Sequence, residues 1–182
     1  MKNYILLLLF ITFLSCKAQN NIPIEKDELG ISVNAPKGVY QYAFRIGEWD
    51  ATHKALISRY KWKTGTGKHK VYVADNGLTF VEETLNDKGE LILKITYDYI
   101  EETDSWENNY LEIATGKKIK YTTKLVDGKM VETVIYEDEN AVDNITYTIL
   151  DSNIHLYISQ RTYGNGFSII THAQIATKKV SN

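Results

Sequence analysis

Hydrophobic and polar residues alternate with a period of two along most of the chain. Within 90–98, Leu91, Leu93 and Ile95 share one face, and Lys94 falls on the other. This spacing is typical of β-strands, in which successive side chains point to opposite faces of a sheet. The pattern therefore predicts strands rather than helices for most of the chain.

Turn sequences divide this alternating tract at regular intervals. Gly and Asn occur where a hairpin needs positive φ, in Asp75-Asn76-Gly77, Asn86-Asp87-Lys88-Gly89, Thr115-Gly116-Lys117, Asp127-Gly128-Lys129 and Gly164-Asn165-Gly166. The segments between turns predict ten strands, at 48–57, 68–75, 78–85, 90–98, 105–113, 118–125, 129–137, 142–150, 153–162 and 166–177. Many short strands in meander order predict an all-β fold, an up-and-down antiparallel barrel of about 8–10 strands.

A short helix is expected before the first strand. Asn34 or Ala35 is a suitable N-cap, and Pro36 fits the first turn. The helix would run to about Ile46 and end at Gly47, the residue type that closes helices in a left-handed conformation. No proline follows Pro36, as a continuous antiparallel sheet requires.

The N-terminal residues predict export. Residues 1–15 combine Lys2 with a short apolar run, which is typical of a signal peptide. Phe13-Leu14-Ser15-Cys16 resembles a bacterial lipoprotein cleavage box, so Cys16 is the predicted lipidation site. The alternative is ordinary cleavage after Ala18. Residues 16–35 would then be a tether and 36–182 the barrel domain, in the cell envelope as an outer membrane lipoprotein or a periplasmic or secreted protein.

Charge and cysteine content exclude several function classes. The formal net charge is −2, which argues against nucleic acid as a partner. Basic residues gather between Lys54 and Lys70, a tract that we interpret as a solvated strand edge. Because Cys16 is the only cysteine, no intramolecular disulfide can form and the core must stabilise the fold. The four histidines lack metal-ligand spacing, so we predict no metal and no cofactor.

The opening of the barrel carries a family resemblance. Gly47-Glu48-Trp49 follows the predicted helix and resembles the Gly-x-Trp of the calycin superfamily, which includes lipocalins. Together with Ser105-Trp106-Glu107-Asn108, it resembles an uncharacterised bacterial family of lipocalin-like secreted proteins over about residues 38–178. The resemblance implies a lipocalin-like barrel in which Trp49 and Gly47 are structural. It also implies a late basic side chain packed on Trp49, for which Arg161 is the candidate.

The last predicted hairpin contains the residues best suited to catalysis. Pairing around Gly164-Asn165 predicts three cross-strand pairs, namely His172 with Tyr157, Gln174 with His155, and Ser168 with Arg161. His172, Tyr157 and Arg161 would supply a general acid/base and a cation that holds an anion. The interpretation that we favour instead puts this face on the outside, because the other face is apolar, with Ile154, Leu156, Ile158, Phe167, Ile169 and Ile175.

Aromatic residues are frequent, with 13 tyrosines and three tryptophans. A barrel wall of this kind suits an amphipathic or ring-shaped small molecule such as a sugar or pigment, with Trp106, Tyr110 and Tyr97 as candidate ligand-binding residues. Tyrosine is also a favoured strand residue in any sheet. Three functional hypotheses remain: a lipid-anchored binding barrel, a lyase, isomerase or dehydratase that uses the same barrel, and a filled-core interaction protein.

Overall fold

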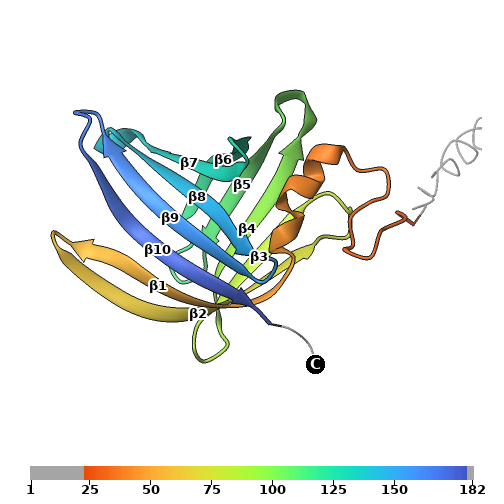
Figure 1. The fold of residues 1–182 in the computed structure, drawn as a ribbon, viewed down its shortest axis with the longest axis horizontal. Coiled ribbons are helices and arrows are strands. Elements are labelled where there is room, and N and C mark those ends of the chain that lie inside the picture. Colours follow the sequence, from red (N-terminus) through yellow and green to blue (C-terminus); the bar gives the residue numbers. More distant parts are fainter. Residues whose placement is uncertain (1–22, 180–182) are drawn as a thin grey trace, which may run out of the picture.

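The computed structural model describes residues 23–179, and these form a closed all-β barrel (Figure 1). Each strand pairs antiparallel with its neighbours in the sequence, and β10 closes the barrel against β1. The strands are β1 (Gly47–Ser58), β2 (Lys61–Val73), β3 (Phe80–Leu85), β4 (Leu91–Ile100), β5 (Ser105–Glu112), β6 (Lys118–Val126), β7 (Lys129–Tyr136), β8 (Ala141–Asp151), β9 (Ile154–Tyr163) and β10 (Ser168–Lys178). The predicted lipocalin-like up-and-down barrel is therefore confirmed. The signal peptide and Cys16 lie outside the described residues.

The predicted turns explain most strand boundaries. Gly77, Gly89 and Gly128 have positive φ at their hairpins, as the sequence predicts. The first hairpin is different because it has no glycine. Its two-residue turn joins β1 directly to β2, with Tyr60 at φ +64°. The missing turn signal explains why the predicted second strand began only at residue 68.

The strand that contains Lys54 is paired on both sides, with β10 and with β2. Residues 61–67 of β2, in contrast, pair with β1 alone, because β3 pairs with β2 only from Lys68 onward. The strand-edge interpretation of the basic tract therefore holds for Lys61 and Lys63. It is wrong for Lys54, and for Lys68 and Lys70, which are paired on both sides. The side chains of Lys54, Lys68 and Lys70 are exposed on the outside of the sheet.

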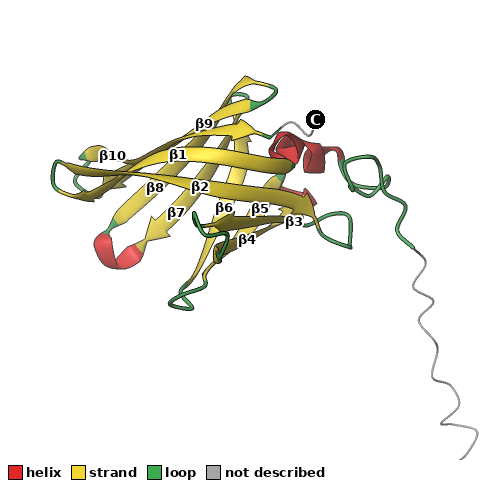
Figure 2. Ribbon diagram, turned by 90° about the horizontal axis from the view of Figure 1, so that it is seen from below, coloured by secondary structure: helices red, strands yellow, loops and turns green. Residues whose placement is uncertain are grey.

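A 3-10 helix, η1 (Lys37–Arg45), covers one end of the barrel (Figures 1 and 2). Its buried residues are Val39, Tyr42 and Arg45, spaced by three as a helix with three residues per turn requires. Pro36 occupies the cap position, which corrects the prediction of Asn34 or Ala35. Within residues 23–179, no helix is long and apolar enough to cross a membrane.

Gly47 begins β1 rather than closing the helix, because Ile46 is already extended. Its φ is +134°, and a Cβ at this position would lie 2.6 Å from Cε of Lys178. The Lys178 side chain is flexible and could move, so the positive φ is what requires glycine here, and the structural role of Gly47 is to allow this backbone conformation at the start of β1. Trp49 donates a hydrogen bond from Nε1 to the Arg45 carbonyl at 2.7 Å, which ties β1 to η1.

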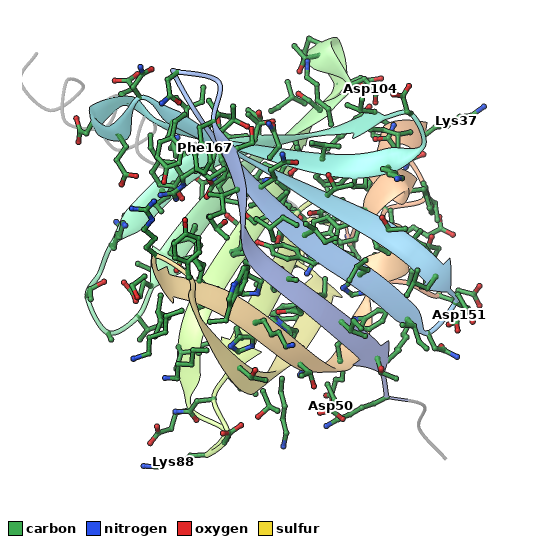
Figure 3. All side chains as sticks on the ribbon, turned by 60° about the vertical axis from the view of Figure 1, so that its left-hand side comes forward. Lys37, Asp50, Lys88, Asp104, Asp151 and Phe167 are labelled. Carbon is green, nitrogen blue, oxygen red and sulfur yellow. The ribbon has the colours of Figure 1, made fainter. Side chains whose placement is uncertain are left out.

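The two ends of the barrel differ. Because the strands alternate in direction, the connections after β2, β4, β6 and β8 lie at the η1 end. The connection after β4 contains the short helix η2 (Glu101–Thr103). The short helix η3 (Glu137–Glu139) follows β7 and therefore lies at the opposite end (Figure 2). Figure 3 shows Lys37, Asp104 and Asp151 toward one end and Lys88 and Phe167 toward the other.

An aromatic core fills the η1 end. The Tyr42 ring lies 4.8 Å from Tyr97, 5.4 Å from Trp106 and 6.2 Å from Phe80 between centroids. Trp106 and Tyr97 are fully buried in it.

A β-bulge in β10 decides which side chains of the last hairpin face inward. Ile170 pairs with Gln160, but His172 pairs with Ser159, so Thr171 is the extra residue. A bulge of this kind shifts the register by one residue and reverses the facing of the residues after it. All three predicted pairs are wrong. Ser168 pairs with Thr162 rather than Arg161 already on the turn side of the bulge, and beyond the bulge Tyr157 pairs with Gln174.

The favoured interpretation of this hairpin as a wet outer face is also wrong. His155 is only 2% exposed, whereas Phe167 and Ile175, which we expected in the core, are 58% and 52% exposed. The polar face of this hairpin is the inner face.

Candidate functional site

A cavity of about 490 Å³ lies inside the barrel, and η1 and all ten strands contribute to its lining. Aliphatic and aromatic side chains form most of its wall, among them Leu93, Ile95, Tyr110, Ile119, Tyr121, Val134, Tyr136, Ile145, Tyr147 and Tyr157. Charged side chains lie deeper, next to η1. The cavity contradicts the premise of the filled-core hypothesis.

The first charged feature is a buried ion pair between Arg45 and Glu82. The Arg45 guanidinium lies 2.8 Å from Oε2 of Glu82, and both side chains are almost fully buried. The Tyr97 hydroxyl donates to the same oxygen at 2.6 Å, and His69 Nδ1 lies 2.9 Å from Oε1. Burial opposes ionisation, yet Arg45 and these hydrogen bonds hold the pKa of the Glu82 carboxyl well below its usual range. Glu82 is therefore a carboxylate at neutral pH.

The second charged feature is Glu132, which is also buried. The hydroxyl groups of Tyr42 and Tyr147 both donate to its Oε1, at 2.7 and 3.0 Å. Among residues 23–179, none donates to Oε2. Burial raises the pKa of Glu132 to about 7, although Arg45 and the two tyrosines oppose the shift. Glu132 thus titrates near neutral pH.

Arg45, Glu82 and Glu132 form the polar floor of the cavity. Histidines line the wall above this floor. The His53 and His172 rings stack with centroids 5.4 Å apart, and Tyr157 meets His172 edge-on at 5.3 Å. Burial, with His53 nearby, lowers the pKa of His172 to about 4, so the ring is neutral at pH 7. Its buried Nε2 has no hydrogen-bond partner within the described part of the chain.

His155 lies outside the cavity lining and packs edge-on against Trp49, with centroids 4.5 Å apart. Burial lowers its pKa to about 3. It is a neutral residue of the core.

The structure brings together two of the three predicted catalytic residues. Tyr157 and His172 are neighbours in the cavity, but Arg161 is not part of its lining. Arg161 makes two hydrogen bonds to Asp143, at 2.7 and 3.0 Å, and contacts Glu139 at 2.9 Å. Because the Arg161 guanidinium is already paired with the carboxylates of Asp143 and Glu139, it is unsuited to bind a substrate anion.

Trp49 has a different basic partner from the one expected. Lys178 Nζ lies 5.6 Å from the Trp49 ring centroid, whereas the Arg161 guanidinium lies 4.4 Å from the Tyr136 ring. The expectation for Arg161 is therefore wrong. The basic residue on Trp49 comes from the last strand, β10.

Of the three predicted ligand-binding residues, one lines the cavity and two do not. Tyr110 lines the cavity, but Tyr97 and Trp106 belong to the core beneath it. Sequence reasoning did not identify Arg45, Glu82 or Glu132 as residues of the site. A signal for Glu132 was available, because it shares a strand face with Met130 and Val134.

Within the described residues, no group of three or more His, Cys, Asp or Glu side chains is arranged to hold a metal ion. No protein-family model matches the chain, and no curated protein matches it.

Solved structures share the fold. The S-type phycobiliprotein lyase CPES from Guillardia theta is 12% identical, with a TM-score of 0.52 over 78% of this chain and 92% of that one. Rv2717c from M. tuberculosis is 8% identical, with a TM-score of 0.51 over 81% and 100%. A DUF3598 family protein of unknown function from Nostoc punctiforme is 12% identical, with a TM-score of 0.51 over 85% and 59%. Identities this low show a common lipocalin-like barrel alone.

Proposed function

We propose that this protein binds a small amphipathic or ring-shaped molecule in the barrel cavity. The observation that carries the proposal is a space of about 490 Å³ with an apolar, aromatic wall and a polar floor. Ligand sites are commonly concave, mostly apolar and supplied with a few fixed polar groups. The tyrosines of the wall offer flat faces to a ring, while Arg45, Glu82 and Glu132 orient its polar part.

We also propose that the protein is exported and lipid-anchored. This part of the proposal rests on the sequence pattern of residues 1–15 and on Cys16, which lie outside the described residues. The protein would then hold its ligand at the cell envelope. Metabolic labelling with a radioactive fatty acid tests this, since labelling should be lost in Cys16→Ser. Labelling of neither protein would support ordinary cleavage after Ala18.

Native mass spectrometry of the exported protein tests the binding function. We expect a co-purified mass that is lost on denaturation. Titration with N-phenyl-1-naphthylamine, a neutral probe that fluoresces in apolar sites, tests the cavity directly. Tyr110→Ala, on the wall, should weaken probe binding about tenfold, which corresponds to ~1.4 kcal/mol. Tyr60→Ala, on an exposed turn, is the matched control. Equal probe binding by both variants and the unaltered protein would contradict the proposal.

An enzyme on the same barrel is the second candidate, favoured by the contact between Tyr157 and the neutral His172. A lyase, isomerase or dehydratase needs a general acid and a general base, and a tyrosine hydroxyl and an imidazole are side chains that can fill these roles. One structural neighbour is itself named a lyase. Because Arg161 is engaged by Asp143, proton transfer would fall to Tyr157 and His172. His172→Gln separates the two candidates, because a binding protein should keep its affinity and an enzyme should lose turnover.

A further inference from the structure

We propose that the ligand carries a protonated amine, and that Glu132 is the residue that pairs with it. The inference deepens the proposed function and rests on it. It is drawn from the free carboxylate oxygen of Glu132, the charge balance of the cavity floor and the aromatic groups around it.

Glu132 presents one free oxygen in the cavity lining. Tyr42 and Tyr147 both donate to Oε1, and no described residue donates to Oε2. Glu132 is one of the residues that line the cavity. Oε2 is not one of the fully buried side-chain atoms without a partner, so this oxygen is accessible from the cavity. A carboxylate oxygen accepts hydrogen bonds, and a ligand with an N–H group directed at Oε2 could donate one.

The charges of the floor show which kind of donor fits. Arg45 lies 2.8 Å from Glu82, and that pair leaves no net charge. Asp143, higher on the wall, already has Arg161 at 2.7 Å. Glu132 is therefore the one lining carboxyl of these three without a cationic partner. A ligand ammonium would supply that charge, whereas a ligand carboxylate would place another negative charge beside Glu132 and Glu82.

The groups that face Glu132 come from several elements. They are Tyr42 and Arg45 from η1, Glu82 from β3, Tyr121 from β6, Tyr147 from β8 and Tyr157 from β9. Arg45 is the only permanent cation among them, and its guanidinium also lies 4.6 Å from the Tyr147 ring. Because burial raises the pKa of Glu132 to about 7, the carboxyl is partly protonated in the empty protein. Pairing with an ammonium would lower that pKa and release the proton.

The surroundings favour an organic cation over an inorganic one. Tyr121 and Tyr157 line the same space, and aromatic rings attract ammonium groups. Ile145 and Val134 line the same space and would contact a hydrocarbon body. The class of ligand is therefore an amine on an apolar or ring-shaped body.

Three probes with one ring system test the inference on the exported protein. They are 2-naphthylmethylamine, 2-naphthylmethanol and 2-naphthoic acid, which differ in charge at about pH 7. Isothermal titration should show the amine binding at least ~10-fold more tightly than the alcohol, with the acid weakest. Glu132→Gln should remove the preference for the amine and leave alcohol binding within ~2-fold. Glu107→Gln, which changes an exposed carboxylate on the same barrel, should behave like the unaltered protein.

A measurement on the unaltered protein keeps the test independent of how the variant folds. Titrations at about pH 7, in two buffers with different ionisation enthalpies, report the protons exchanged on binding. The amine should release protons as Glu132 ionises, and the alcohol should release none.

The outcomes separate the two proposals. If all three probes bind with equal affinity, the cavity binds ligands and the inference about the amine is wrong. It is also wrong if Glu132→Gln loses amine and alcohol binding alike, or if the amine binds without proton release. If no probe binds, the proposed binding function is contradicted and the inference with it.

Discussion

Arg45, Glu82 and Glu132 are charged residues at positions where proteins usually bury apolar side chains. The Arg45–Glu82 pair and Glu132 are tolerated for different reasons. Arg45 and Glu82 neutralise one another, and Tyr97 makes a hydrogen bond to each of them. Glu132 has hydrogen bonds but no cation of its own, and its raised pKa follows from that. The residues of the floor therefore differ in what their removal should do.

Replacing Arg45 should strongly destabilise the fold. Arg45→Met leaves Glu82 buried without its cation, and breaking a buried ion pair costs about 3–5 kcal/mol. Urea unfolding measures the change, with Arg59→Met on the exposed first turn as the control. In Arg45→Met/Glu82→Leu, part of the stability should return, because no unpaired charge remains. A loss below about 1 kcal/mol for Arg45→Met would show that the pair is not buried in solution.

Glu132 predicts a specific dependence of stability on pH. Its folded pKa of about 7 lies above the ordinary value of 4.5, so the folded state holds the proton more tightly than the unfolded state. The unaltered protein should therefore lose stability relative to Glu132→Gln as pH rises from 4.5 to 7, by about 3 kcal/mol in total. The unfolding free energies of both proteins, measured at several pH values, give this difference. The contributions of the other titrating groups cancel in it, because both proteins contain those groups. A difference that does not change with pH would contradict the assigned pKa.

At the scale of elements, β10 and η1 determine what the cavity contains. The bulge at Thr171 lets Ile169 and His172 both face inward on one strand, as their pairing with Arg161 and Ser159 requires. η1 inserts Tyr42 and Arg45 at one end and so forms the floor. Without these two irregular features, the ten regular strands would enclose a different interior.

Two deletions in β10 should have opposite consequences. Removing Thr171 takes out the extra residue of the bulge, so residues on both sides keep their facing and the barrel should still fold. Removing Ala173 from the regular part of the ladder should turn Ala176, which is 1% exposed, outward and Ile175 inward. Circular dichroism and thermal unfolding compare the two proteins. Equal loss of structure in both would contradict the assigned bulge.

At the scale of the whole molecule, closure of the barrel makes an enclosed binding space possible. β1 pairs with β10 from Trp49–Lys178 to Ala55–His172, so the sheet has no open edge along this seam. η1 closes one end, while strand connections, including η3, surround the other end of the described barrel (Figure 2). A ligand in this space would contact most strands at once and should stabilise the entire fold.

Ligand binding should therefore raise the melting temperature. At a concentration of 2-naphthylmethylamine about 100-fold above its dissociation constant, linkage predicts about 2.7 kcal/mol of added stability. Differential scanning fluorimetry measures the shift, and 2-naphthoic acid at the same concentration serves as the comparison. A shift of equal size with both compounds would be evidence against charge selection by Glu132.

The sequence by itself determined the ten strands, most of their turns and their meander order, whereas the pairing of β1 with β10 that closes the barrel is seen only in the structure. These depend on alternation and on backbone preferences of neighbouring residues such as Asp127 and Gly128, which are local properties. It did not determine the floor of the cavity. The Tyr42 hydroxyl meets Glu132 across 90 residues of sequence, and the contact exists only because η1 closes the end of a completed barrel. The inward facing of His172 likewise depends on one bulge that alternation does not reveal. Local geometry is encoded by adjacent residues, whereas the interior of a barrel is decided by which distant faces its closure brings together.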